Sequence, residues 1–368
     1  MKQKFWIGFS STEQIDSAFV CSLYEYFGDI ERAFNCSKKD FSEMEADVEI
    51  NEKKLDNFLR LRDKIDPDKA FDEVEKRGIK VLTFDDEKYP KLLREIHNPP
   101  AVLYYKGDLS SCNLDRTVAF VGSRRASTDG RDSVKRIIND FRNTDICIVS
   151  GLAEGIDAVS HRSAIENNLK TIGIIASGFD FKYPSSNKDL YEKLEHGCGA
   201  VVTEYYPTFE PIKFRFPQRN RIVTGLSYGT VVGEAALKSG AIISANLTLE
   251  QGRELMCIPG SINNKNTEGV YKLLKNGATM VTSGEDILNA LNWVINIEKT
   301  DTEADSSLPL EYLTLLDIIN IEPLGFDEIQ TKTGLDTEEL LKTLTMMEIE
   351  GYIEQTDGDR YKRGKQRR

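Results

Sequence analysis

Residues 117–122 read TVAFVG, an uninterrupted apolar run that ends at a glycine, and this stretch decides the fold. Further apolar runs follow it at ICIVSG (146–151), TIGIIASG (171–178), AVVTEY (200–205), GTVVGEA (229–235) and LMCIPG (255–260). Patterns with helical spacing lie between them, at 129–142, 155–168, 187–196 and 240–251. Continuous apolar strands joined by helices predict a parallel sheet covered on both faces. We therefore expect an α/β fold with a Rossmann-like, doubly wound domain over residues 115–295.

The segments before this domain have a different character. Residues 1–77 carry apolar residues at helical spacing, with a helix expected to start near Ser11-Thr12 and stop at Gly28, which predicts a helical (SAM-like) domain. Residues 78–114 form a connector with two short strands, IKVLTF and AVLYYKG, around a proline-punctuated stretch.

The segments after the domain predict a linker and a winged helix. Residues 296–308 are polar and acidic without periodicity, which is typical of a linker. Within 309–368 we expect three helices and a hairpin at Asp357-Gly358, followed by a basic tail; the helices are predicted over 309–320, 325–333 and 336–350. The third helix carries a net charge of −4, with five acidic residues against Lys342, and therefore suits a protein surface or its own chain better than DNA. The tail is either a DNA contact or a solvated end.

The composition limits the classes of function. The 368 residues carry 48 Lys and Arg against 60 Asp and Glu, a net charge of −12, which argues against coating of nucleic acid or membrane by bulk charge. Residues 113–290 hold 21 basic and 20 acidic side chains, so an anion site is expected there. Six scattered cysteines without a CxxC pair and three histidines predict no zinc site and no other metal site. With no recognisable leader and no apolar run of membrane-spanning length, we expect a reduced, cytoplasmic protein.

Ligands of a parallel sheet bind outside the carboxyl ends of its strands, and the first such loop is VGSRRAS. Gly122 permits a tight turn, backbone amides with Ser123 suit a phosphate, and Arg124 suits a bidentate pair with it. The GxGxxG fingerprint and a Walker A lysine are absent, which disfavours NAD or ATP as a cofactor, and we expect no cofactor. The alternative is an ordinary turn with a surface arginine.

The segment FRFPQRNRIVTG (214–225) holds the densest basic cluster of the middle region. Its arginines and phenylalanines interleave, at Arg215, Arg219 and Arg221 and at Phe214 and Phe216. Arginine neutralises phosphate while aromatic rings stack on bases, so this pattern suits single-stranded nucleic acid. The alternative is that the rings are core and the arginines pair with carboxylates.

Two further features attract attention at the same edge of the sheet. Ser239-Gly240 precedes a helix and is a candidate anion-holding helix start. Asp157 and His161 lie four apart on one helix face, a spacing compatible with hydrolase chemistry, but a carboxylate near its own helix start and a packed histidine explain the pair better.

These motifs, in this order, resemble the DNA-processing protein A family (DprA, also called Smf). The resemblance spans about 115–290 and rests on VGSRRAS, SGLAEGIDAVSH, TIGIIASGFDFKYPSSN, TEYYP, FRFPQRNRIVTGLS, VVGEAALKSGAIISA, GRELMCIPGSI and TEGVYKLLKNGA. The series FPxRNR…SG…IPG is specific, whereas any single piece is weak. The upstream KYPKLLREIHNPPAVLYYKGDL also looks like the family's approach to its core.

The resemblance implies a non-enzymatic protein that binds and protects incoming single-stranded DNA, self-associates as a homodimer through the Rossmann-like domain, and loads the RecA recombinase during natural transformation. It implies no catalytic residues and no membrane contact. The expected DNA-binding residues are Gly122, Ser123, Arg124, Lys182, Asn187, Phe216, Arg219, Asn220, Arg221, Ser239 and Gly240. One departure is that Tyr183-Pro184 is followed by Ser185 and Ser186 where members often carry a basic residue, so Lys182 or Lys188 is the candidate for that charge.

The second hypothesis is a nucleotide-cleaving enzyme. Related Rossmann-like phosphoribohydrolases carry a PGGxGTxxE signature, and GLSYGTVVGE (225–234) keeps the Gly-Thr and the Glu but lacks the Pro-Gly-Gly. Glu234 is then the catalytic candidate with Arg221 on phosphate. Because fold alone does not imply function, this is the weaker hypothesis.

Overall fold

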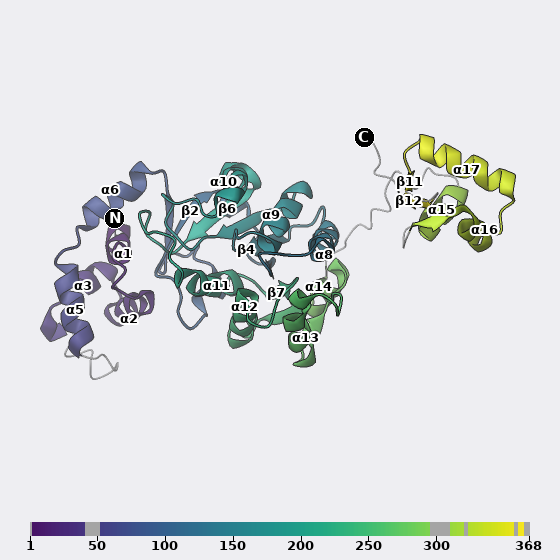
Figure 1. Cartoon of the computed structure of the whole chain (residues 1–368). Coiled ribbons are helices and arrows are strands. Elements are labelled where there is room, and N and C mark those ends of the chain that lie inside the picture. The colour runs from purple at the N-terminus through teal and green to yellow at the C-terminus, as the bar shows by residue number, and fades with distance from the viewer. Residues whose placement is uncertain (1, 41–51, 295–309, 320–322, 357–359, 364–368) are drawn as a thin grey trace. The chain divides into compact units, whose positions relative to one another are not determined.

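The computed structural model describes residues 2–40, 52–294, 310–319, 323–356 and 360–363 (Figure 1). Two compact units divide the chain, Met1–Ile297 and Glu298–Arg368. The predicted linker 296–308, the turn Asp357-Gly358 and the last five residues of the basic tail lie outside the described residues. Within the described ranges, no helix has the length and apolar character needed to cross a lipid bilayer.

The first unit begins with helices, as predicted (Figure 1, purple). They are α1 (Gln3–Ser10), α2 (Ser17–Phe27), α3 (Ile30–Asn35), α5 (Glu52–Arg62) and α6 (Pro67–Lys76). The expected start near Ser11-Thr12 was wrong, because those residues join α1 to α2, which starts at Ser17. Gly28 ends α2 in the left-handed conformation that glycine adopts without steric cost. Helix α1 was missed; it buries Trp6 completely, and its Ser10 hydroxyl contacts the hydroxyl of Tyr104 on the sheet.

One nine-stranded sheet organises the unit, in the order β1-β2-β6-β5-β4-β3-β7-β8-β9. The strands are β1 (Lys80–Thr83), β2 (Val102–Gly107), β3 (Thr117–Val121), β4 (Cys147–Ser150), β5 (Thr171–Ile174), β6 (Gly199–Thr203), β7 (Gly229–Val232), β8 (Glu254–Cys257) and β9 (Thr279–Met280). Strands β3 to β9 pair in parallel, with Val118 opposite both Ile148 and Gly229. The connector strands β1 and β2 join the same sheet, where they pair antiparallel to each other and to β6. The sheet is therefore mixed, because the connector extends its edge.

Helices cover both faces of this sheet. They are α7 (Lys91–Arg94), α8 (Thr128–Asn139), α9 (Ile156–Glu166), α10 (Lys188–Lys193), α11 (Arg215–Gly225), α12 (Gly240–Glu250), α13 (Glu268–Lys275) and α14 (Gly284–Ala290). Short helical turns lie at Leu109–Ser111, Ser185–Asn187, Leu194–Cys198 and Lys265–Thr267.

Strand β3 shows why both faces are covered. Its Val118 and Phe120 belong to one apolar core together with α8 and α14, whereas Ala119 and Val121 belong to the other core with α11, α12 and α13. These two cores confirm the predicted Rossmann-like α/β fold. Strand order reverses between β3 and β7, since β4 lies on one side of β3 and β8 on the far side of β7. Open α/β sheets bind ligands at such a switch point, outside the carboxyl ends of the strands.

The second unit is a winged helix, as predicted. It comprises α15 (Leu310–Ile319), α16 (Phe326–Thr333), α17 (Thr337–Ile349), β10 (Leu324–Gly325), β11 (Ile353–Thr356) and β12 (Arg360–Arg363), with strand order β10-β12-β11. Its own core includes Leu315, Leu340 and Met347. The acidic residues Glu338, Glu339 and Glu348 of α17 and the following Glu350 are exposed.

Candidate nucleic-acid interface

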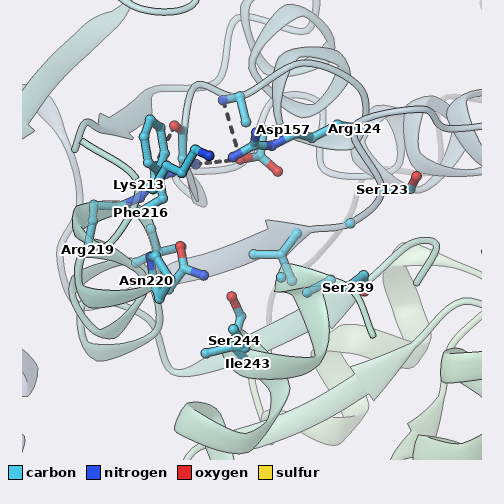
Figure 2. Close-up of a pocket in the computed structure, with 18 of the residues that line it drawn as sticks. Ser123, Arg124, Asp157, Lys213, Phe216, Arg219, Asn220, Ser239, Ile243 and Ser244 are labelled. Carbon is cyan, nitrogen blue, oxygen red and sulfur yellow. Dashed lines mark hydrogen bonds between the residues drawn. The ribbon is translucent and has the colours of Figure 1, made fainter. Parts of the chain in front are cut away.

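A pocket of about 610 Å³ lies at the switch point of the sheet (Figure 2). Its walls come from the loop after β3, the loop after β4, helix α11 and the start of α12. Eight of the eleven predicted DNA-binding residues line it, and they come from three separate stretches of sequence: Gly122, Ser123, Arg124, Phe216, Arg219, Asn220, Ser239 and Gly240.

The loop after β3 is held rigidly by the backbone. The Ser123 amide donates to the Glu234 carbonyl at 2.7 Å, and the Ser123 carbonyl accepts from the Ile156 amide at 3.2 Å. The Ser123 hydroxyl oxygen accepts from the Arg125 amide at 3.1 Å. The Ser123 amide is therefore already used, and the expected phosphate contact falls to the Arg124 side chain, which is exposed at the rim.

An aromatic wall faces Arg124 across the rim. The Arg124 guanidinium lies 5.4 Å from the ring of Phe216, and the ring of Tyr183 meets Phe216 edge-on at 5.6 Å. The exposed Lys213 side chain lies on the same side of the pocket (Figure 2). Cations beside partly exposed rings are the combination that holds phosphates and unstacked bases together.

Arg219 lies deeper, and its environment differs from the expectation. Its guanidinium is almost fully buried, at 4% exposure, and donates to the carbonyls of Gly151 and Ile174. Burial lowers its pKa, and the nearby carboxylate of Asp157 opposes that shift. Burial likewise raises the pKa of Asp157, which accepts from the Gly151 amide at 3.2 Å. Reversal of the charge at Arg219 is therefore expected to damage the fold, and Arg219 cannot serve as a purely DNA-directed variant.

The start of α12 closes the pocket on the side of β7. Ser239 precedes the helix in an extended conformation, and its side chain makes no capping hydrogen bond. Gly240 is exposed and lines the pocket. Ser239, Ile243 and Ser244 line it as well (Figure 2). A helix start that faces a cavity places backbone amides and the positive end of the helix dipole toward it.

Three predicted DNA-binding residues lie away from this pocket. Arg221 forms an ion pair with Glu204 and lines a different pocket. Lys182 pairs with Glu195 at 3.3 Å. Asn187 is buried and donates to the carbonyls of Leu152 and Ala153, at 3.0 and 3.1 Å, so it holds the loop after β4 in place. For these three residues the structure favours internal partners.

Glu234, the candidate of the enzyme hypothesis, is an internal structural residue. Its side chain is 2% exposed and does not line the switch-point pocket. The carboxylate accepts from the Ser127 amide at 3.0 Å, from the Ser127 hydroxyl and from the Asn264 amide group at 2.9 Å. Gly130 makes room for it, because a methyl group there would overlap the carboxylate. The start of α8, where a Rossmann-like fold usually holds a nucleotide phosphate, is thus filled by the chain itself.

Asp157 and His161 do not form the pair that hydrolase chemistry requires. His161 is fully buried, and its Nδ1 lies 2.7 Å from the Thr171 hydroxyl. Burial lowers the pKa of His161 from 6.5 to about 3, so the ring is neutral at physiological pH. The described residues contain no group of three or more His, Cys, Asp or Glu side chains placed to hold a metal ion.

Sequence reasoning missed Lys213, Tyr183 and Ile243 as pocket residues. Lys213 stands three residues before Phe216, and its proximity to the FPQRNR segment is the signal that was available. Ile243 stands one turn into α12, where the apolar composition of the helix conceals which residues face outward.

A Rossmann-like unit with a cationic, aromatic pocket at its switch point, together with a winged helix, defines a class of nucleic-acid-handling proteins. Residues 80–292 match the family model of DNA recombination-mediator protein A, and residues 299–359 match that of the DprA winged helix domain. Because the first match spans more than half of the chain, this protein belongs to the DNA recombination-mediator protein A family.

Relatives and solved structures agree with this membership. The DNA processing protein DprA of Streptococcus pneumoniae is 43% identical over 203 residues, which cover 55% of this chain and 71% of that protein. The X-ray structure of DprA from Streptococcus pneumoniae matches with a TM-score of 0.64 at 35% identity, over 78% of this chain and 95% of that one. A structure of DNA processing protein A from Helicobacter pylori, concerned with its single-stranded DNA binding mode, matches with a TM-score of 0.52 at 29% identity, over 58% of this chain and 95% of that one.

Proposed function

We propose that this protein binds single-stranded DNA in the switch-point pocket and mediates recombination by protecting incoming strands and loading a RecA recombinase onto them during natural transformation. The observation that carries the proposal is the convergence of Arg124 and Lys213, both exposed, with the Phe216 and Tyr183 rings at one rim. Single-stranded binding without sequence readout needs this pairing of backbone neutralisation with base stacking. The single-stranded DNA binding mode of the Helicobacter pylori relative supports it.

The wider proposal concerns assembly and location. The protein acts in the cytoplasm as a homodimer through its Rossmann-like unit, with RecA as partner. Its working parts are a helical domain over 1–77, a connector over 78–114, the DNA-binding domain over 115–295, a linker over 296–308 and the winged helix over 309–368. The acidic α17 supports a winged helix that contacts protein, or its own chain, rather than DNA.

The direct test is fluorescence anisotropy of a labelled single strand and of its duplex, titrated with the full chain at several salt concentrations. We expect preference for the single strand and a fall of log affinity with log salt of roughly 0.7 per phosphate contact. Arg124→Glu and Lys213→Glu should each weaken binding for all sequences alike and reduce the slope by roughly 0.7. Lys275→Glu, an exposed lysine outside the pocket, is the matched control.

Two outcomes would contradict the proposal. If both variants bind the single strand as tightly as the wild type does, the pocket is not the binding site. If the wild type binds the duplex as tightly as the single strand, it has no preference for single strands. RecA loading is tested separately, by the rate of RecA nucleation on a single strand with wild-type protein and with the Arg124→Glu, Lys213→Glu double variant. Equal stimulation by both would contradict a mediator role that depends on this pocket.

A further inference from the structure

Helix α11 separates two pockets. Its Phe216, Arg219 and Asn220 line the switch-point pocket on one side, whereas Arg215 and Gln218 line a second pocket of about 350 Å³ on the other. The second pocket also includes the end of α1, the loop that joins it to α2 (residues 12–16), the first residue of α2 and the loop after β6. It is large enough for one nucleobase, a planar group whose size is similar to that of a tryptophan side chain.

The second pocket offers aromatic surface together with polar groups. Phe214 lines it and is 56% exposed, which is unusual for so large an apolar side chain. The neighbouring rings of Tyr205 and Phe209 already pack about the Arg215 guanidinium, at 4.9 and 5.0 Å. Phe214 is therefore the ring of this wall with the most surface left for another planar group.

The charges of the second pocket disfavour a phosphate. Three carboxylates line it, those of Glu13, Asp16 and Glu204. Its two guanidiniums are each engaged, Arg215 with Glu13 and Arg221 with Glu204. The lining therefore has one more negative than positive charge. A neutral ligand with N–H donors suits it better than an anion.

Asp16 is the best-placed acceptor for such a donor. It precedes α2, is exposed, and its side chain makes no capping hydrogen bond to that helix. Carboxylates accept hydrogen bonds from the exocyclic amino group of cytosine, and the equivalent position of thymine carries a carbonyl that cannot donate.

The two pockets adjoin along the chain. Lys213 lines the first and Phe214, the next residue, lines the second, so their Cα atoms are about 3.8 Å apart. A strand held at Lys213 by a phosphate can therefore turn a neighbouring base over the start of α11.

On the basis of the proposed single-stranded DNA binding, we propose that the second pocket takes one unstacked base of the same strand. The base stacks on Phe214 and donates its exocyclic amino group to Asp16, so that cytosine is preferred over thymine at this one position. The strand as a whole stays bound by the switch-point pocket.

The test measures affinity of the full chain for oligothymidylate and for a set of oligomers in which a single cytosine replaces each thymine in turn. The strands carry a fixed label at one end, and anisotropy gives each affinity. We expect a gain of about fivefold or more for cytosine at one position of the set. Asp16→Ala should abolish this gain and change the affinity for plain oligothymidylate less than about twofold, because thymine offers no amino group to that carboxylate. Phe214→Ala should abolish the gain and also weaken oligothymidylate binding, because every base can stack on a ring. Phe214→Trp should retain the gain, and Tyr26→Ala, an exposed aromatic outside both pockets, should behave as wild type.

The outcomes separate this inference from the proposed function. Normal binding of oligothymidylate without a favoured cytosine position, or a gain that persists in Phe214→Ala, overturns the inference alone. No binding of any oligomer by the wild-type chain overturns the proposed function and this inference with it. Near-ultraviolet circular dichroism of each variant shows whether the native packing is kept. If Phe214→Ala loses that packing, the decision rests on Asp16→Ala. The inference then stands only if the Asp16→Ala variant no longer binds the cytosine-containing oligomer more tightly than oligothymidylate.

Discussion

Helices α8 and α12 start at the same edge of the sheet, after the neighbouring strands β3 and β7, and their starts are built differently. At α8 the Glu234 carboxylate accepts from the amide and hydroxyl of Ser127, and Ser127 in turn accepts from the Gly130 amide at 3.1 Å. At α12 the Ser239 side chain makes no capping hydrogen bond, and Gly240 is exposed to the pocket. We call the start of α8 closed, because the Glu234 carboxylate occupies it, and the start of α12 open, because it faces the pocket without such a partner.

This difference indicates how a Rossmann-like sheet can change its ligand without a change of fold. The closed start of α8 occupies the position at which nucleotide-binding relatives of this fold hold a phosphate. The open start of α12 and the exposed Arg124 leave the other side of the switch point available for a polyanion. The buried Glu234 carboxylate therefore occupies the nucleotide-phosphate position at α8 and leaves only the start of α12 open to a phosphate.

The largest expected effect on stability comes from removing the Glu234 carboxylate from the start of α8. Glu234→Ala removes the buried acceptor and leaves the Ser127 and Asn264 donors without a partner, so we expect the free energy of unfolding to fall by about 3 kcal/mol. Urea unfolding followed by tryptophan fluorescence measures it, because both tryptophans of the chain, Trp6 and Trp293, lie in the first unit. Glu268→Ala, an exposed glutamate in the first turn of α13, should cost well under 1 kcal/mol. Equal losses in the two variants would contradict a special role for Glu234.

A second prediction concerns pH and α9, the helix after β4 at the same edge. Burial depresses the pKa of His161 to about 3 in the folded state, against about 6.5 when unfolded. The unfolded state therefore binds the extra proton as pH falls below about 6.5, and the free energy of unfolding should fall by up to about 1.4 kcal/mol per pH unit. His161→Asn should lack this component, so the difference in slope between it and the wild type isolates His161 from the acid titration of Asp157. If the unfolding free energies of the wild type and His161→Asn change with pH at the same rate, His161 takes up its proton equally well in the folded state, which contradicts the prediction.

The serines that precede the two helices provide a smaller and more direct comparison. Ser127→Ala removes a cap to Gly130 and a hydrogen bond to Glu234, and should cost about 1–2 kcal/mol of unfolding free energy. Ser239→Ala should cost less than about 0.5 kcal/mol, because its hydroxyl makes no capping bond. Urea unfolding of both variants decides it, and a similar cost for the two would remove the distinction between closed and open starts.

The last prediction concerns a carboxylate introduced at the start of α12. Ser239→Asp places a carboxylate at the start of α12, which should stabilise that helix by a few tenths of a kcal/mol and repel a phosphate from the pocket. We expect single-strand affinity to fall about tenfold, or about 1.4 kcal/mol. Anisotropy measures the affinity, and Ser283→Asp, at the capped start of α14 outside the pocket, is the control. Unchanged affinity in Ser239→Asp would contradict a ligand contact at this helix.

Most strands and several helices could be predicted because their pattern is local. Apolar runs such as 117–122 specify strands with both faces buried, and the predicted helices 129–142 and 240–251 correspond to α8 and α12. Helix α11 was not predicted, since three arginines and Pro217 obscure its periodicity. A proline in the first turn of a helix removes no intrahelical hydrogen bond, so Pro217 is compatible with the helix that forms there.

The sequence predicted where the site lies on the sheet more accurately than which of its charged side chains are free to contact a ligand. Glycines and polar residues after the strands identify the edge of the sheet, and Arg124 and Phe216 do face the pocket. Which charges are satisfied internally depends on contacts between distant segments, as for Arg221 with Glu204 and Lys182 with Glu195. Sequence spacing alone does not distinguish an exposed Arg124 from a buried Arg219.

The position of α11 between two pockets limits how this segment can evolve. Each residue added to or removed from a helix rotates all later side chains by about 100°, as 3.6 residues make one turn. A single-residue insertion after Phe216 would therefore turn Asn220 and Arg221 away from the sides on which they now lie. Substitutions can alter one pocket at a time, but insertions and deletions alter both, so we expect length variation among homologous chains to fall in the loops on either side of α11.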